Sequence, residues 1–436
     1  MNINADLHIH SRFSAATSPR MDLPTLAAEA RRKGIQLLGT GDCLHPKWLQ
    51  EVQELEEQDG VFFFKPAGTV DETGGAVTTA FVLTVEVEDL RRVHHLLIVP
   101  AISKAEELYE SFRPYSPDID SDGRPSLRLS GAEIAEHARD AGALIGPCHA
   151  FTPWTALYAY HDSLTDCYSD MAGYLSFVEL GLSADSSYAD RIEELRDLTF
   201  LTNSDAHSPY PIRLAREFNR FQMEDLSFLE LKAAIQRERG RKSVLNVGFP
   251  PQEGKYNESA CIRCYTHYSL AEAIARRWRC DCGGLIKKGV RDRVNELANC
   301  DGTHPEHRPP YLHLIPLAEV VGLAVQKSPS SKTVQQIWES LLAEFGTEVT
   351  VLIDTPLDSI EGAHFEFNAT ALERVVEAIR AFRGGKIRIL PGGGGKYGAI
   401  QLTADTGVDT RERGDGSELE QEREYGRKKQ LSLLDF

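Results

Sequence analysis

Short apolar runs alternate with helical stretches through the first 240 residues, and this alternation predicts a parallel α/β barrel or layered sheet. Six runs have the character of buried strands: 35–39, 81–85, 95–99, 143–146, 174–178 and 198–202. Helices are predicted between some of them, at 22–33, 131–141 and 189–197. Polar residues stand where these strands end, which is the position at which α/β proteins place their chemistry.

The 436 residues exceed one ordinary hydrophobic core, so several domains are expected. After an α/β domain over 1–240, the Pro- and Gly-containing stretch 241–258 predicts a linker, and 259–300 a small cysteine-rich module. Residues 301–402 predict a mixed α/β domain with helices at 313–326, 333–345 and 369–383 and strands at 348–353 and 386–390. The tail, 403–436, is charged and nearly free of apolar residues up to 429, which predicts disorder.

Composition excludes some classes of protein. No apolar run reaches about 18 residues, so no membrane span or membrane partner is expected. The N-terminus has no basic segment followed by an apolar stretch, which predicts a cytoplasmic enzyme, taken here as a monomer. A net charge of −17 argues against nonspecific coating of nucleic acid. It is compatible with a nuclease whose basic residues are local.

Histidines and carboxylates stand in order at the strand ends. His8 and His10 share one face of an extended segment, so both can bind one divalent ion. Further candidates follow later apolar runs: Glu86, His94 or His95, His149, Asp205 and His207. The mixture favours Zn, Mn or Fe, with Mg as a further candidate. One of these histidines alone would be an ordinary core or surface residue, but the ordered set predicts a metal site.

This set resembles the polymerase and histidinol phosphatase (PHP) superfamily. The matching motifs are Asp6-Leu-His8-Ile-His10, Glu86, His95, His149 and Asp205-Ala-His207. The resemblance implies a distorted (β/α) barrel with two or three divalent metals at the carboxyl ends of its strands. It also implies that catalysis depends on His8, His10, Glu86 and Asp205. The superfamily ligand usually precedes Leu-Leu, as His95 does, so His95 is the predicted ligand and His94 the alternative.

The second superfamily motif departs from the usual pattern. Here it is Gly41-Asp42-Cys43-Leu44-His45, with Cys43 where a histidine is usual. His45 and His207 are therefore the candidate ligands of a third metal. Bound metals would supply hydroxide near neutral pH and neutralise phosphoryl oxygens, so no Ser or Cys nucleophile is required. Cys148, beside His149, is interpreted as a small buried residue.

Four cysteines form two pairs separated by fifteen residues. They are Cys261, Cys264, Cys280 and Cys282, followed by Gly-Gly, which allows a tight turn. In a chain without a visible signal peptide, such clusters indicate a metal site before they indicate disulfides. The spacing predicts a closed, tetrahedral zinc site with a structural role, with a short helix between the pairs. Four reduced thiols without metal are the alternative.

The cysteine-rich region is locally basic. Between 255 and 293, nine Lys and Arg residues face four acids, and Tyr and Trp residues lie between them. Basic side chains bind phosphates and aromatic rings stack on exposed bases, so DNA contact is predicted. The candidates are Arg276, Arg277, Arg279, Lys287 and Lys288. Each aromatic residue alone is equally compatible with covering the small module.

Two further motifs lie near the C-terminus. The glycine run 391–398 lacks the spacing of a nucleotide-binding P-loop, which leaves a phosphate- or base-contacting loop or a plain turn. The end of the tail resembles peptides that bind a DNA sliding clamp, through Gln430, Leu433 and Phe436. An apolar end on a charged segment favours this partner.

The order of these modules, with Glu253-Gly-Lys-Tyr256 and His307-Arg-Pro-Pro-Tyr-Leu-His313 around the cysteines, resembles the endonuclease Q family over about residues 1–400. The resemblance implies a DNA repair endonuclease that hydrolyses the phosphodiester 5′ to uracil, hypoxanthine, xanthine or an abasic site. Damaged DNA is the implied partner, with the damaged nucleotide turned out of the stack. The alternatives are a PHP phosphatase acting on a small phosphate ester and a noncatalytic scaffold.

Overall fold

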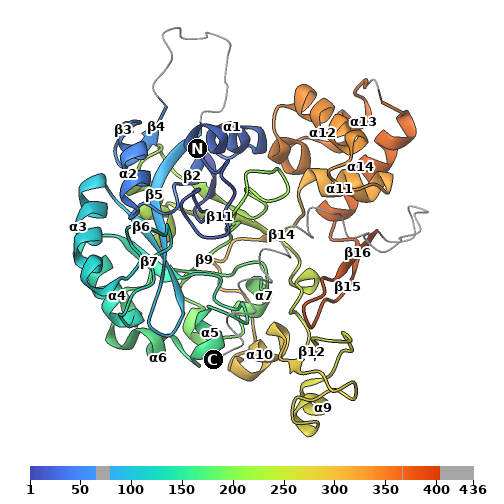
Figure 1. The fold of residues 1–436 in the computed structure, drawn as a ribbon. Coiled ribbons are helices and arrows are strands. Elements are labelled where there is room, and N and C mark those ends of the chain that lie inside the picture. Colours follow the sequence, from blue (N-terminus) through green and yellow to red (C-terminus); the bar gives the residue numbers. More distant parts are fainter. Residues whose placement is uncertain (65–78, 366, 403–436) are drawn as a thin grey trace.

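A computed structural model describes residues 1–64, 79–365 and 367–402. Its centre is a mixed sheet in which β14, β11, β10, β1, β2 and β5 are successive neighbours, with β4 and β3 beyond β5 and with β6 and β7 continuing from β5 (Figure 1). The strands are β1 (Asn2–Asp6), β2 (Leu37–Gly39), β3 (Glu56–Gln58), β4 (Val61–Phe63), β5 (Ala80–Glu88), β6 (His94–Val99), β7 (Leu144–Pro147), β10 (Phe218–Gln222), β11 (Lys242–Gly248) and β14 (Tyr311–His313).

A separate parallel pair, β8 (Phe177–Glu179) and β9 (Thr199–Leu201), closes this sheet into a distorted barrel. On one side, the Ser176 amide, next to β8, donates to the Ile145 carbonyl of β7 at 3.3 Å. On the other, the Asn246 side-chain amide of β11 donates to the Phe200 carbonyl at 3.0 Å. The predicted α/β barrel is confirmed, although several of its strand pairs are antiparallel.

Helices cover the outside of the barrel: α1 (Leu23–Lys33), α2 (Pro46–Gln53), α3 (Ile102–Phe112), α4 (Gly131–Asp140), α5 (Leu157–Tyr160), α6 (Leu164–Tyr168) and α7 (Ser186–Ala189). In contrast, α8 (Phe228–Gln236) packs its apolar residues against the cluster inside the barrel. Local sequence fixes their ends. The Asp22 side chain caps the first turn of α1, and Gly34 ends it in the left-handed region. Ser130 and Glu133 form a capping box on α4.

Alternation along the strands separates two apolar layers. In β6, Leu96 and Ile98 belong to one buried cluster inside the barrel, whereas Leu97 and Val99 pack with the helices outside. The same parity places Val82 of β5 inside and Leu83 outside. The same parity determines which of the two neighbouring histidines, His94 or His95, faces the barrel interior.

The cysteine-rich module contains β12 (Ala260–Cys261), α9 (Leu270–Ala275), β13 (Ile286–Lys287) and α10 (Val290–Leu297). A C-terminal helical group lies beside α1 (Figure 1). It consists of α11 (Leu317–Val325), α12 (Lys332–Phe345), α13 (Leu357–Glu361) and α14 (Ala369–Arg383), followed by the hairpin β15 (Ile387–Leu390) and β16 (Ala399–Leu402). No helix in the described ranges has the length and apolar character needed to cross a membrane.

Three predicted elements are wrong. The helix expected at 189–197 is instead α7 and a 3₁₀ turn at Glu193–Leu195, because Ile192 is extended. The strand expected at 348–353 is a π-helical turn, Thr350–Asp354, because the β-branched run buries its side chains among helices. Residues 242–248 of the expected linker are β11, paired to β10 and β14. The outer domain boundaries remain predictions.

A buried ion pair joins the C-terminal helices to the barrel. Lys33 Nζ, at the end of α1, lies 2.5 Å from Glu348 Oε1, and both side chains are almost fully buried. Glu348 also accepts hydrogen bonds from the Leu317 amide at 3.0 Å and the Trp338 indole at 2.9 Å. The carboxylate therefore organises three segments at once.

Replacing Glu348 by Ala is expected to lower the free energy of unfolding by about 3–5 kcal/mol, because the Lys33 charge stays buried without its partner. Urea unfolding followed by circular dichroism measures this. As a control, Glu377→Ala removes an exposed partner of Arg380 and is expected to cost less than about 1 kcal/mol. Equal effects of the two substitutions would contradict this account of the interface.

Candidate metal centres

Two histidines and two carboxylates converge at the carboxyl ends of β1, β5 and β9. His10 Nε2 lies 3.2 Å from both Glu86 Oε2 and Asp205 Oδ1. His8 Nε2 lies 3.8 Å from Glu86 Oε1 and from Asp205 Oδ1. His8 Nε2, His10 Nε2 and Asp205 Oδ1 are buried atoms without a hydrogen-bond partner in the described structure. Buried polar atoms are normally satisfied, so these donor atoms fit a divalent cation placed between them.

Glu86 connects this group to a second one. Its Oε1 lies 2.6 Å from His94 Nδ1 and 3.0 Å from His149 Nε2, whereas its Oε2 faces His10. The ligand atoms of Glu86, His94 and His149 lie within 4.8 Å of one another. A carboxylate with one oxygen in each group is suited to bridge two metals.

The geometry favours His94 over the predicted His95. His94 lies on the inner face of β6, two residues before Leu96, and reaches Glu86. His95 points to the outer face, where its Nδ1 lies 2.7 Å from the Tyr168 hydroxyl. Strand alternation is the physical reason. The sequence carried no signal for it, because residues 96–99 are apolar on both faces of the strand.

The two candidates for a third metal lie differently. The His207 ring centroid is 4.4 Å from that of His10, and His207 Nδ1 is 3.7 Å from Asp205 Oδ1. His207 therefore lies at the edge of the centre. His45 is buried at the start of α2 and stacks on Phe13 at 4.3 Å. It belongs to none of the potential metal groups in the part of the chain that the structure describes.

Two carboxylates orient the first histidine pair. Glu179 Oε2 lies 2.8 Å from His8 Nδ1, and Asp42 Oδ1 lies 3.1 Å from His10 Nδ1. Ionised carboxylates only accept hydrogen bonds, so Nδ1 carries the proton and Nε2 keeps its lone pair toward the centre. Glu179 also accepts from the His149 amide at 3.0 Å.

Sequence reasoning assigned these supporting residues no role. Glu179 follows the apolar pair at the end of a predicted strand, so its position as a strand-end carboxylate was a usable signal. Arg124 also was not predicted as part of the centre. It lies in a loop, so its position in the sequence gives no comparable signal. Its guanidinium lies 3.2 Å from Glu86 Oε2.

Opposite charges hold this buried centre together. Burial would raise the pKa of Glu86, but His94, Arg124 and hydrogen bonds from His10 hold it well below the usual range. Burial would lower the pKa of His10, yet Asp205, Asp42 and Glu86 raise it well above its usual value. A cation that binds here displaces the histidine protons, so metal affinity is expected to fall as the pH falls.

Backbone strain accompanies the centre. His149, Asp205 and Asp42 all have positive φ angles, at 29°, 47° and 51°. Non-glycine residues adopt this region at a cost of roughly 1–3 kcal/mol each, and they gather at functional sites. The surrounding barrel therefore holds these side chains in positions that the free chain would avoid.

The four predicted zinc cysteines come together. Cys261 Sγ lies 3.5 Å from Cys282 Sγ, Cys264 Sγ lies 3.5 Å from Cys280 Sγ, and all four fall within 4.8 Å of one another. The Tyr268 hydroxyl donates to Cys280 Sγ at 3.1 Å. None of the four forms a disulfide. This compact tetrad fits one tetrahedral zinc ion.

The predicted DNA-contacting residues differ in their surroundings. Arg276 pairs with Asp281, and Lys288 pairs with Glu296. Lys287 Nζ lies 3.4 Å from the ring centroid of Trp154 in the barrel domain. Arg277 and Arg279 are exposed.

The glycine run packs against the cysteine-rich module. The amides of Gly392, Gly395 and Gly398 donate to carbonyls of residues 252–255. A Cβ added at Gly394 would lie 2.4 Å from the Cys261 carbonyl oxygen, so only glycine fits this close backbone approach. The run is therefore a docking turn, and these amide donors are unavailable to a phosphate. The clamp-like residues 430–436 lie outside the described part of the chain.

Comparison with known sequences relates the chain to two uncharacterized proteins. Residues 316–386 match the family described as the MJ0043 C-terminal domain. The chain is 45% identical over 260 residues to MJ0043 of Methanocaldococcus jannaschii, covering 58% of this chain and only 31% of that protein. It is 30% identical over 420 residues to YqxK of Bacillus subtilis, covering 92% of this chain and 99% of that protein.

Two solved structures are similar over nearly the whole chain. The lesion-specific endonuclease PfuEndoQ from Pyrococcus furiosus is 47% identical, with a TM-score of 0.86, covering 94% of this chain and 98% of that one. An endonuclease Q complex with a 27-mer duplex, with an abasic lesion at the active site, is 46% identical. The TM-score is 0.84, and the match covers 95% of this chain and 100% of that one.

A distorted α/β barrel whose strand ends carry this histidine and carboxylate centre defines the PHP class of metal-dependent phosphoesterases. The order of modules and the identity over full length narrow the class further. The chain belongs to the endonuclease Q family.

Replacing Glu179 by Gln is expected to weaken divalent-metal binding at the barrel centre about 10–100-fold, because the amide no longer fixes and polarises the His8 ring. Calorimetric titration with Mn²⁺ measures the affinity. Glu230→Gln, at another buried carboxylate on α8, is the matched control and should leave it unchanged. An unaltered affinity in the Glu179 variant would rule out this supporting role.

Replacing Cys280 by Ser is expected to remove one equivalent of zinc per chain and to open the 259–300 segment to proteolysis, because three thiolates hold the ion poorly. Metal analysis and limited proteolysis measure both effects. Cys300→Ser is the control, since the Cys300 thiol instead donates to the Asp190 carbonyl at 3.2 Å. Retention of zinc by the Cys280 variant would refute the four-cysteine site.

Proposed function

We propose that this chain is a DNA repair endonuclease that hydrolyses the phosphodiester 5′ to a deaminated base or an abasic site. The observation that carries the proposal is the Glu86-bridged centre, in a chain that is 46% identical to an endonuclease Q bound to a duplex with an abasic lesion at the active site. The breadth of bases cleaved rests on the family resemblance alone.

The residues divide the chemical work between them. Metals bound at the centre would supply a hydroxide near neutral pH and offset the charge of the phosphoryl group. Glu86 and Asp205 would provide the anionic ligands, and His8, His10, His94 and His149 would provide neutral nitrogens. Carboxylates hold the other ring nitrogen of His8, His10 and His94. Arg124, ion-paired to Glu86 and partly exposed, is positioned to contact a phosphate oxygen.

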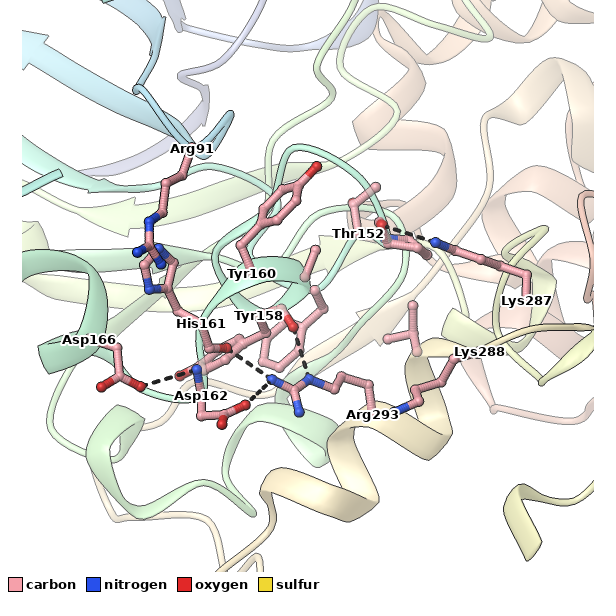
Figure 2. A pocket seen from close by; sticks show the side chains of 15 residues that line it. Arg91, Thr152, Tyr158, Tyr160, His161, Asp162, Asp166, Lys287, Lys288 and Arg293 are labelled. Carbon is pink, nitrogen blue, oxygen red and sulfur yellow. Dashed lines mark hydrogen bonds and ion pairs between the residues drawn. The ribbon is translucent and has the colours of Figure 1, made fainter. Parts of the chain in front are cut away.

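A cavity of about 700 Å³ lies between the barrel and the cysteine-rich module. Figure 2 shows Arg91 and His161 on one side of it and Lys287 on the other. The barrel side is formed by the loop around Phe151 to Asp162, which begins two residues after His149. This volume accommodates one nucleotide, so we place the everted, damaged nucleotide here.

The cysteine-rich module extends the proposed DNA surface away from the centre. Arg277 and Arg279 are exposed, and neither has an ion pair among the described residues. We therefore expect both side chains to contact DNA phosphates. Trp154 is exposed and held by Lys287, so it offers a stacking surface beside the cavity.

The tail supplies a second proposed partner. Gln430, Leu433 and Phe436 match the spacing of a sliding-clamp peptide, and this part of the proposal rests on the sequence alone. Attachment to a clamp would keep the enzyme close to newly replicated DNA.

Labelled duplexes that carry uracil, hypoxanthine, an abasic site or normal bases test the proposed activity in the presence of Mn²⁺, Mg²⁺ or Zn²⁺. Incision is expected only in the lesion strands, one phosphodiester 5′ to the lesion. Asp205→Ala should reduce it about 100-fold or more, because the centre loses an anionic ligand, and the surface substitution Asp140→Asn should not.

Failure to cut any lesion strand with any of these metals would contradict the proposal. Hydrolysis of a small phosphomonoester without DNA incision would instead select a phosphatase. Undiminished incision by the Asp205 variant would show that the activity arises elsewhere in the chain.

A further inference from the structure

A further group of potential metal ligands, separate from the barrel centre and from the four cysteines, lies on the outer face of the β5–β6 hairpin. It consists of Asp89 in the turn between these strands, His95 of β6 and Cys167 of α6. One ligand atom from each lies within 4.8 Å of the others, and all three side chains are buried. Carboxylate, imidazole and thiolate together form a donor set that zinc prefers.

His95 presents an unsatisfied nitrogen to this group. Its Nδ1 lies 2.7 Å from the Tyr168 hydroxyl, which fixes the ring. Its Nε2 faces Asp89 Oδ2 at 3.4 Å, yet it is a buried atom without a hydrogen-bond partner in the described structure. Leaving a buried polar nitrogen without a partner lowers the stability of the fold by roughly 1–3 kcal/mol. A bound ligand other than a protein group is therefore expected at His95 Nε2.

Cys167 is packed as a ligand of such a site would be. A Cβ added at Gly131 would lie 2.7 Å from Cys167 Sγ and 3.1 Å from His95 Cε1, so glycine lets the thiol and the ring approach each other. Gly131 is also the first residue of α4, whose amino-terminal dipole favours an anion beside it.

We propose that Asp89, His95 and Cys167 bind a structural Zn²⁺ ion. His161 Nε2 is a second buried nitrogen without a partner in the described residues, but it lies outside this group of three and would have to move closer to become a fourth ligand. Binding forms a bond from the metal to the Cys167 sulfur and releases the thiol proton to solvent. The ion joins the β5–β6 hairpin to α6, and this hairpin carries Glu86 and His94 on its inner face.

A simple Asp89–His95 hydrogen bond is the competing arrangement. It would satisfy the His95 nitrogen if the two atoms moved closer, but it gives Cys167 no role. The two arrangements differ in metal content and in the state of one sulfur atom, both of which are measurable without an activity assay.

Metal content provides the first test. The Cys167→Ala protein is expected to hold one equivalent of metal less per chain than the wild type, and His95→Gln should lose at least that equivalent. Cys43→Ala removes an equally buried thiol that belongs to no potential metal group in the described ranges, and its content should be unchanged. Equal metal content in the wild-type and Cys167→Ala proteins overturns the proposal.

Cadmium NMR of the exchanged wild-type protein provides the second test and requires no substitution to fold. A resonance with one sulfur ligand is expected beside that of the four-cysteine site. It should vanish in Cys167→Ala and persist in Cys148→Ala, whose thiol adjoins His8 and Glu86 at the barrel centre. A spectrum that shows only the four-sulfur resonance overturns the proposal, as does a one-sulfur resonance that follows Cys148.

Discussion

The arrangement of the barrel centre depends on the pairing of the buried Glu86 carboxylate with the basic side chains around it. One oxygen faces His94 and His149, and the other faces His10 and Arg124. An anion of this kind inside a barrel is tolerated only when it is paired on every side. The strands that bring these partners therefore need each other: without β6 and β7, Oε1 of Glu86 would lose His94 and His149 and be left buried without them.

The same constraint explains the ring of supporting contacts. Glu179 on β8 and Asp42 after β2 each hold one imidazole by its Nδ1 nitrogen, so β2 and β8 support the potential ligands that β1, β5 and β9 carry. The positive φ angles at His149, Asp205 and Asp42 are part of this arrangement. Charge pairing and hydrogen bonds retain backbone conformations that local sequence preferences disfavour.

Much of the centre was predictable because it depends on local rules. Alternating residues share a face, and strand ends carry the chemistry, which was enough to single out His8, His10, Glu86, His149 and Asp205. His95 shows the limit of a motif: its neighbour His94 occupies the inner face with Leu96 and Ile98. The sequence could not reveal this, since residues 96–99 are apolar on both faces. His45, near the second motif, stacks on Phe13 and belongs to no potential metal group among the described residues, and its buried Nδ1 has no hydrogen-bond partner there.

Other features depend on long-range packing that no local window contains. The β-branched residues 349–351 favour a strand, yet Val351 is buried in a helical environment. The sequence of residues 242–248 does not indicate which strands pair with them. β10 precedes them by about twenty residues, and Tyr311 follows by more than sixty. Arg124 reaches Glu86 from a loop whose course is set only by the folded barrel.

The pairing of β11 with β14 has a consequence for how the molecule is built. The two strands run parallel, with Gly248 opposite His313. Parallel neighbours cannot be joined by a tight hairpin and require a long crossover. The segment that contains the four cysteines is that crossover, so it is held at both ends by the barrel sheet. Its deletion would leave β14 with no route to its place in the sheet. The cysteine-rich segment is thus part of the path by which the barrel acquires its outermost strand.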